Sequence, residues 1–226
     1  MTARLRGLAD SRRPGSLADR LRQRRFELLR GLVDTLDRPV RILDVGGTTG
    51  FWERVGYAGR DGVEIVLLNR IDQEAPHGNM TAVVGDAADL SAFGNGSFDV
   101  VVSNSVIEHL PTPELQVRMA TEIRRVGRRL YVQTPNRYFP LEPHFLFPFF
   151  AVLPLNVRAF IQQHMDLGWH ARQPSRAAAL REVRSIRLMT GGELRRAFPG
   201  ARIERERILV FTKSFIVLDG WDPQEG

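Results

Sequence analysis

Three glycines follow an apolar segment early in the chain, and together they could hold a ligand against the main chain. Residues 41–45 are largely apolar on both faces, which predicts a strand covered on both sides of a parallel sheet. Gly46, Gly47 and Gly50 come next, where glycine permits a positive φ and lets a ligand approach the backbone closely. Asp44, near the end of the strand, can accept hydrogen bonds from loop amides or from a cationic ligand group. The pattern is typical of a nucleotide-like ligand at the carboxyl edge of a first strand.

Two common nucleotide motifs are excluded. The dinucleotide fingerprint needs glycine at its first, third and sixth positions. Counting from Gly46, the third position is Thr48 and the sixth is Phe51, so this fingerprint is absent. The phosphate loop needs a Gly-Lys-Ser/Thr ending, but the only lysine of the chain is Lys213, far from the glycines.

The elements that must position this loop recur along the chain. Four more apolar segments predict strands, at residues 63–68, 81–84, 98–103 and 129–134. A helix is expected from about Pro113 to Val126, between the last two of these strands. Strands that alternate with helices favour a doubly wound α/β sheet.

The loop resembles the first motif of class I S-adenosylmethionine-dependent methyltransferases, Asp-x-Gly-x-Gly-x-Gly. Asp44, Gly46 and Gly50 match this motif, while Thr48 replaces the middle glycine. The segment FDVVVSNSVIEHL, residues 98–110, looks like the fourth motif of the same family. The resemblance covers about residues 38–218. It implies a Rossmann-like seven-stranded, mostly parallel sheet with helices on both faces and an antiparallel C-terminal strand.

The resemblance also implies S-adenosylmethionine as cofactor and a set of residues around it. Asn69 stands where the family usually has an acid on the ribose hydroxyls, Asp86 and Ala87 stand beside the adenine, and Asn104 stands at the amino-acid or sulfonium end. The expected cofactor-binding residues are Asp44, Gly46, Gly47, Thr48, Gly50, Asn69, Asp86, Ala87 and Asn104.

Three parts make up the predicted chain: an N-terminal helical segment at 1–37, the methyltransferase domain at 38–218 and a tail at 219–226. The pattern of residues 16–33 predicts a helix capped by Ser16. In related enzymes a basic residue on such a helix meets the cofactor carboxylate, which here leaves Arg24 and Arg25 as alternatives.

An insertion at about residues 135–170 is expected to hold the acceptor. Thr134-Pro135-Asn136 matches the start of the substrate loop in type 11 methyltransferases. Within the insertion, Phe145 to Leu155 is almost entirely apolar yet too short to cross a bilayer. Three interpretations remain open: the run packs on the domain, covers an apolar substrate, or touches a membrane surface.

Methyl transfer to a hydroxyl benefits from a general base, for which His109 and His144 are the candidates. The competing interpretation is that both histidines only pack and bond locally. Some relatives hold a divalent ion with Glu-x-x-Glu-His at the fourth motif. Here Ser105 replaces the first of those acids, so we expect no metal unless Glu142 and His144 join Glu108 and His109.

The sequence pattern of the C-terminal part of the chain predicts a helix capped by Thr190. An antiparallel strand pair, 202–210 with 211–218, is expected after it. Between these two strands no glycine or proline marks a turn.

The charge and the apolar content of the sequence limit the classes of function that this protein can have. The formal net charge is +6, and all but one of the 32 basic residues are arginine. The chain lacks a signal-peptide core and any apolar stretch of ~20 residues, which favours a cytoplasmic protein, with peripheral membrane contact through Phe145–Leu155 as a further expectation. The predicted function is methyl transfer to a small-molecule or lipid-like acceptor. The alternatives are an RNA methyltransferase or binder, which we do not favour because nucleic-acid motifs are missing, and a non-catalytic protein that kept the fold.

Overall fold

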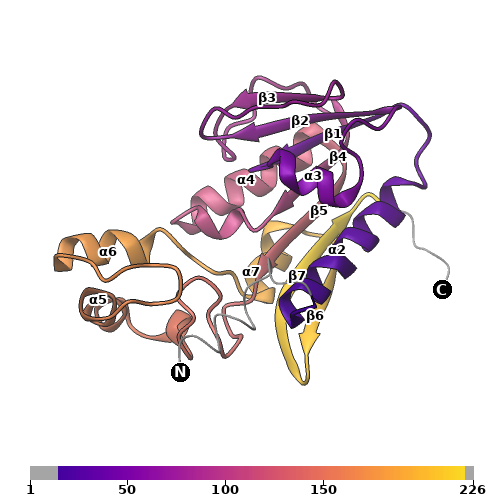
Figure 1. Cartoon of the computed structure of the whole chain (residues 1–226). Helices are drawn as coiled ribbons and strands as arrows, with labels where there is room; N and C mark the ends of the chain where they lie inside the picture. The colour runs from indigo at the N-terminus through magenta and orange to yellow at the C-terminus, as the bar shows by residue number, and fades with distance from the viewer. Residues whose placement is uncertain (1–14, 222–226) are drawn as a thin grey trace.

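One seven-stranded sheet organises the molecule, described here from a computed structural model for residues 15–221. The strand order is β3-β2-β1-β4-β5-β7-β6 (Figure 1). The strands are β1 (Val40–Val45), β2 (Val63–Asn69), β3 (Met80–Val84), β4 (Phe98–Asn104), β5 (Gly127–Pro135), β6 (Arg202–Ile208) and β7 (Phe211–Asp219). The first five strands pair in parallel, whereas β7 runs antiparallel to both β5 and β6. The predicted fold class is confirmed, and each predicted strand is present with ends shifted by one or two residues.

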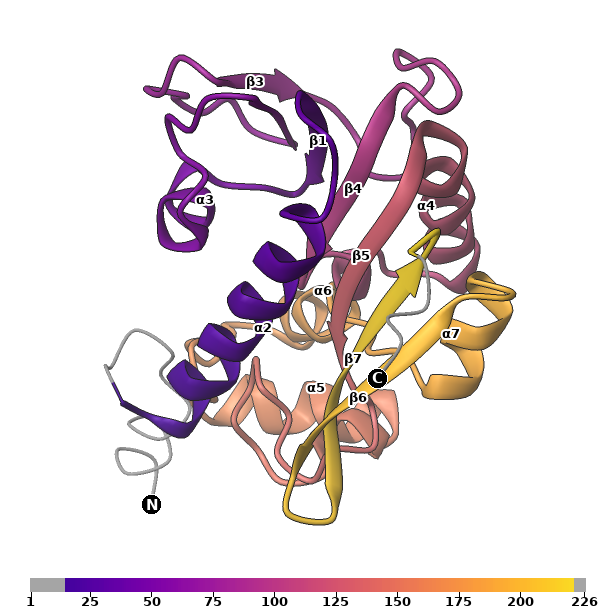
Figure 2. The same ribbon diagram turned by 90° about the vertical axis from the view of Figure 1, so that its right-hand side faces the viewer.

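Both faces of the sheet are covered, as the apolar first strand predicts. Ile42 of β1 belongs to the cluster on the face of α2 (Leu17–Val33) and α3 (Thr49–Val55). Leu43 and Val45 belong to the opposite cluster, together with α4 (Pro113–Val126) and α7 (Gly191–Ala197). Figure 2 shows α2 and α4 on opposite sides of the strands. Alternate residues of one strand therefore face two different apolar cores.

The predicted helix caps are present. Ser16 accepts the amide of Asp19 at the start of α2, and Thr190 forms a capping box with Glu193 at the start of α7. Helix α2 contributes buried Phe26 and Leu29 to the same core as the sheet. Residues 1–14 and 222–226, which include parts of the predicted N-terminal segment and tail, lie outside the described residues.

The insertion after β5 forms a lobe with its own apolar cluster. It contains a short 3₁₀ turn, η2 (Phe150–Val152), and the helices α5 (Leu155–His164) and α6 (Arg176–Arg184). Phe145 and Phe150 are buried in this lobe, whereas Phe149 and Val152 are exposed. The apolar run is thus divided: part of it packs on the domain, and part of it faces outward. Among residues 15–221 there is no helix with the length and apolar character needed to cross a membrane.

The β6–β7 hairpin turns without glycine or proline. Leu209 takes a positive φ of 52° at the tip, between strands that end at Ile208 and begin at Phe211. Branched and bulky side chains rarely adopt this conformation, and here the tip is exposed.

Candidate functional site

A cavity of about 240 Å³ lies at the carboxyl edge of the parallel strands, and we call it the loop cavity. It is lined by Gly46, Leu68, Asn69, Arg70, Gly85, Asp86, Ala87, Ser105, Val106, His109 and Leu110. Four of the nine residues predicted to bind the cofactor therefore meet there, together with one predicted catalytic histidine. They come from the carboxyl end of β2 and from the turns after β1, β3 and β4, which parallel strands bring to one edge.

Gly46 and Gly47 are the two positions of the loop where a side chain has no room. Gly46 has a φ of 80°, and a Cβ on it would lie 2.4 Å from Val106 Cγ2. On Gly47 a Cβ would lie 2.2 Å from Asp44 Oδ2. Gly50, in the first turn of α3, leaves ordinary contact distances to a Cβ. The structure thus gives a steric need for the first two glycines of the motif but not for the third.

Asn69 fastens the glycine loop. Its Nδ2 donates to the carbonyl of Gly47 at 3.2 Å, while its Oδ1 accepts the amide of Arg70. Gln73, which the sequence analysis missed, donates to the same carbonyl at 2.9 Å. Thr48 is exposed at the start of α3 and does not line the cavity. Nothing in the local sequence marks Gln73, because its role depends on how the loop after β2 returns to the loop after β1.

Asp44 lies beneath the loop rather than in the cavity. It is 2% exposed and accepts a 2.8 Å hydrogen bond from Trp52 Nε1. Burial raises the pKa of Asp44 to about 7, although the bond from Trp52 opposes that rise. The position supports the loop from below, with its carboxylate against Gly47.

The structure distinguishes the two candidate arginines of α2. Arg25 Nη1 donates to Asn104 Oδ1 at 3.4 Å, whereas Arg24 is exposed. Asn104 itself ends β4 and does not line the loop cavity. Its successor Ser105 does, at a φ of 57°, and donates to Gln133 Oε1 at 2.8 Å. A non-glycine residue held at positive φ in a cavity wall is a strained position of the kind that gathers at functional sites.

A second cavity, of about 360 Å³, adjoins the first, and we call it the apolar cavity. It is lined by Leu17, Ala18, Arg25, Ser105, Gln133, Pro135, Phe139, Leu141, Pro143, Leu146, Ile208, Lys213 and Ser214. Ser105 lines both cavities. The walls come from α2, the predicted substrate insertion and the closing hairpin, so only the folded chain assembles them.

Lys213 supplies an ionisable group in the apolar cavity that the sequence analysis did not assign to the site. Burial lowers its pKa, nearby Arg25 lowers it further, and Glu206 at 3.9 Å opposes both effects.

The two predicted catalytic histidines lie together. The rings of His109 and His144 meet edge to face with centroids 5.2 Å apart. His144 Nδ1 lies 2.7 Å from Glu142 Oε1, and Glu142 also accepts the amides of His144 and Phe145. Burial disfavours a charged His144, yet the hydrogen bond and charge of Glu142 outweigh it and raise the pKa. Burial lowers the pKa of His109, and the charge of His144 lowers it further.

Glu108 completes a cluster with these histidines. It is fully buried, and one oxygen accepts from Thr134 Oγ1 at 2.9 Å while the other has no partner among residues 15–221. Burial raises the pKa of Glu108. Single ligand atoms of Glu108, His109 and His144 lie within 4.8 Å of one another, so these three residues could hold a metal ion. The expectation that no metal is used stays a prediction.

The loop cavity suits the adenosine-bearing ligand expected from the sequence. Gly46 and Gly85 leave the main chain exposed to a ligand because they have no side chain. Asn69 and Asp86 present polar side chains to the cavity. Val106 and Leu110 form apolar walls against which a ring could pack. Asp86 uses one oxygen locally, accepting the amide of Ala88 at 2.8 Å. The roles of the individual residues toward a ligand stay predictions.

Residues 11–201 match a family model described as a methyltransferase domain. An uncharacterized protein of Mycobacterium tuberculosis is 38% identical over 61 residues, covering 27% of this chain and 21% of that protein. The chloroplastic 2-methyl-6-phytyl-1,4-hydroquinone methyltransferase 2 of Oryza sativa subsp. japonica is 35% identical over 103 residues, covering 42% of this chain and 29% of the relative. The matched segments thus span less than a third of either relative.

A solved structure shares the fold at low identity. It is the 1,6-didemethyltoxoflavin-N1-methyltransferase of Burkholderia thailandensis, with a TM-score of 0.51 and 13% identity. The alignment covers 88% of this chain and 76% of that one.

The buried Asp44 predicts a pH effect on stability. Because its pKa is raised from 3.8 to about 7 in the folded protein, the stability it contributes is present at low pH and lost as pH rises through this window. The free energy of unfolding of the wild type should therefore fall relative to Asp44→Asn by up to about 1.4 kcal/mol per pH unit between pH 5 and 7. Urea unfolding of both proteins at pH 5, 6, 7 and 8 measures this, and a pH-independent difference would contradict it.

Proposed function

This chain belongs to the methyltransferase-domain family, and from that premise we propose that it transfers a methyl group from S-adenosylmethionine to a small, apolar or lipid-like acceptor. The observation that carries the proposal is Ser105, which lines both the loop cavity and the apolar cavity. A cofactor in the first and an acceptor in the second would meet at this residue.

The loop cavity is the proposed cofactor site. When bound, S-adenosylmethionine supplies a methyl group activated by its sulfonium. The chain's own contribution is positioning: Gly46 and Gly85 keep side chains away from the main chain, while Asn69 and Gln73 hold the loop through the carbonyl of Gly47. Alignment of the reacting groups supplies much of the rate enhancement in a direct displacement.

The apolar cavity is the proposed acceptor site. Most of its walls are apolar, including Phe139, Leu141 and Leu146, whereas Arg25 and Gln133 offer a few polar contacts. Such a cavity favours a largely apolar molecule oriented by a small number of hydrogen bonds. The rice relative is named for a hydroquinone substrate, which agrees with this chemistry. For this chain we take a hydroxyl as the proposed methyl acceptor.

A hydroxyl acceptor has to lose a proton, and two sets of residues could take it. His109 lines the loop cavity with a lowered pKa, so it is neutral near pH 7, and it packs against the Glu142-oriented His144. Lys213 instead lines the apolar cavity itself, also with a lowered pKa. We assign the base to His109, with His144 as its neighbour and positioning residue, because histidine titrates closest to neutral pH.

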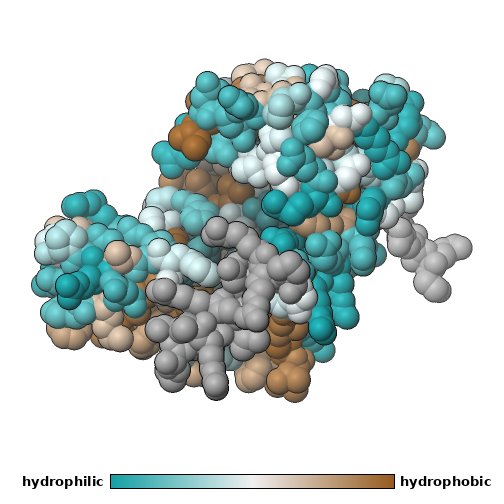
Figure 3. Space-filling view, in the orientation of Figure 1, coloured by the Kyte–Doolittle hydropathy of each residue, from teal (hydrophilic) through white to brown (hydrophobic). Residues whose placement is uncertain are grey.

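Peripheral contact with a bilayer is part of the proposal. Leu209 and Val210 at the hairpin tip are 89% and 84% exposed, and Phe149 and Phe160 are exposed on the inserted lobe. Figure 3 shows hydrophobic surface at the tip and along the lower edge of the lobe. A soluble surface rarely gathers such side chains without a partner.

An anionic bilayer fits this surface better than a protein partner of unknown shape. Arg205 and Arg207, exposed on β6 next to the tip, would meet its negative charge. Ile208, beside Leu209, lines the apolar cavity. Insertion of the tip would therefore bring the lipid phase to the acceptor site. The predicted cytoplasmic location would place this contact on a cytoplasmic membrane face.

A side chain on Gly46 should weaken cofactor binding. Gly46→Ala places a Cβ against Val106 at a positive φ, so affinity for S-adenosylhomocysteine should fall at least about tenfold, measured by calorimetry. With labelled S-adenosylmethionine and alkyl-substituted hydroquinones, the wild type should give a methylated product by mass spectrometry and Gly46→Ala should give much less. Gly78→Ala is the control, because no atom lies within 4 Å of its added Cβ. Unchanged affinity in Gly46→Ala would refute the cofactor site.

The base can be identified by comparing two variants. His109→Asn should lower the rate of methyl transfer by roughly 10²-fold or more, a much larger effect than its change in cofactor affinity. Lys213→Gln should lower it much less. His77→Asn, a histidine that pairs with Glu53 on the surface, is the control. A larger loss in Lys213→Gln than in His109→Asn would transfer the role to the lysine.

Hairpin tip variants test the bilayer contact. Leu209→Ser combined with Val210→Ser should reduce co-sedimentation with phosphatidylglycerol vesicles several-fold, because the apolar area available for burial is lost. Val117→Ser, which removes an exposed apolar side chain from α4, is the control. Equal binding by wild type and both variants would exclude the tip as the contact.

A further inference from the structure

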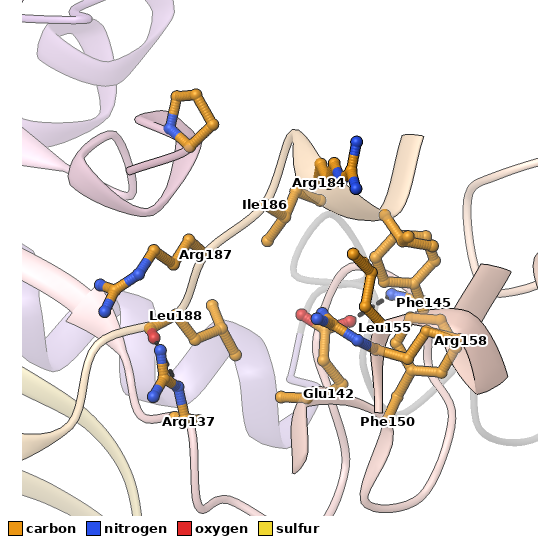
Figure 4. Close-up of a pocket in the computed structure, with 13 residues that line it drawn as sticks. Arg137, Glu142, Phe145, Phe150, Leu155, Arg158, Arg184, Ile186, Arg187 and Leu188 are labelled. Atoms are coloured by element: carbon orange, nitrogen blue, oxygen red, sulfur yellow. Dashed lines mark hydrogen bonds between the residues drawn. The ribbon is translucent and has the colours of Figure 1, made fainter. Parts of the chain in front are cut away.

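A third cavity, of about 350 Å³, is lined in part by a residue that follows the η1 turn (Ile107–His109). Leu110 lines the loop cavity and the next residue, Pro111, lines this one. Figure 4 shows the cavity between Arg137 and Arg187 on one side and Arg158 and Arg184 on the other. We call it the arginine cavity.

Its four arginines come from separate parts of the chain. Arg137 follows β5, Arg158 lies on α5, Arg184 ends α6, and Arg187 lies between α6 and α7. No run of basic residues in the sequence announces the cluster, since the insertion and the segment after it have to fold together to form it.

Within the described part of the chain, ion pairs reach only two of these four guanidinium groups. Glu193 pairs with Arg187 and, at 3.7 Å, with Arg137. Glu142 lines the cavity, but its oxygens accept from the amides of His144 and Phe145 and from the ring of His144. Two guanidinium groups are left without an ion pair among residues 15–221, those of Arg158 and Arg184.

Arg158 is the most informative of the four. Its Nε is buried and has no hydrogen-bond partner among the described residues. Burial lowers the pKa of Arg158 and the charge of Arg137 lowers it further, while Glu142 opposes them. A buried donor without a partner, on a cation crowded by another cation, is unfavourable until an anion joins it.

The remaining walls are apolar. They include Phe145, Phe150, Leu155, Ile186 and Leu188. An inorganic ion would leave these walls unused, whereas an organic group attached to the ion would bury them.

We propose that the arginine cavity binds the phosphate group of a small organic molecule, held by Arg158 and Arg184 with its organic part against the phenylalanines. Guanidinium groups match the geometry of phosphate oxygens and hold them with charge-assisted hydrogen bonds. The ligand would sit beside Glu142, which orients His144, so binding would reach the histidine pair from outside the acceptor cavity. This site does not depend on the proposed methyl transfer.

Calorimetric titration of the full chain without S-adenosylmethionine tests the site. Phenyl phosphate should bind the wild type, and inorganic phosphate should bind at least tenfold more weakly because it lacks the ring. Arg158→Gln should weaken phenyl phosphate at least tenfold, and Arg184→Gln several-fold. Arg181→Gln is the matched control, since Arg181 is an exposed arginine of α6 outside the cavity.

Three outcomes would overturn the proposal: no binding of phenyl phosphate by the wild type, equal weakening in Arg181→Gln, or full affinity in Arg184→Gln, which tests the cavity even if Arg158→Gln does not fold.

A soluble phosphate ester and a lipid headgroup share this chemistry. Displacement of phenyl phosphate from the wild type by phosphatidylglycerol vesicles would identify the headgroup as the source, whereas vesicles that bind at the hairpin tip and leave phenyl phosphate bound would identify a soluble ester. Affinity for S-adenosylhomocysteine, measured in the same variants, should stay unchanged, which separates a failure here from a failure of the proposed function.

Discussion

The site depends on the contact between the loops that follow β1 and β4. The main chain at Gly46 passes so close to Val106 that no side chain fits between them, and Gly47 is held in the same way over Asp44. This approach brings the bare backbone of one loop against the side chains of the other. The loop cavity forms along that line because two parallel neighbouring strands end at one edge. Glycine is needed here for space as much as for its freedom at positive φ.

Buried carboxylates then fix the flexible parts around this contact. Asp44 lies under the glycine loop with the indole of Trp52, and Glu142 gathers two backbone amides and a histidine ring at the start of the inserted lobe. Each carboxylate is removed from water, and hydrogen bonds to its oxygens offset part of the cost. Glu108, beside both histidines, keeps one buried oxygen without a hydrogen-bond partner among the described residues. These buried carboxylates thus fix the position of the glycine loop and of the His144 ring.

Three cavities surround these groups, and their linings differ in character. The loop cavity offers bare backbone, the apolar cavity offers carbon surface, and the third offers guanidinium groups. All three draw on the insertion after β5 or on the turn that it contacts. The sheet therefore supplies a fixed edge, while the inserted lobe, α2 and the closing hairpin determine what can bind beside it. This division is common in doubly wound folds, where loops on a rigid scaffold carry the specificity.

The sequence by itself determined the elements and the edge of the sheet at which the candidate site lies. Apolar strands, the caps at Ser16 and Thr190, and the glycine loop are local signals, because each depends on residues a few positions apart. Tertiary structure alone decided the contacts across long separations. Residues of α2 look equivalent until the sheet shows that Arg25, and not Arg24, faces Asn104. His109 meets His144, and four arginines meet around one cavity, only after the insertion packs on the domain. The sequence shows the periodicity of each helix and strand. The packing of whole elements determines which side chains come into contact, and this packing cannot be read from a local pattern.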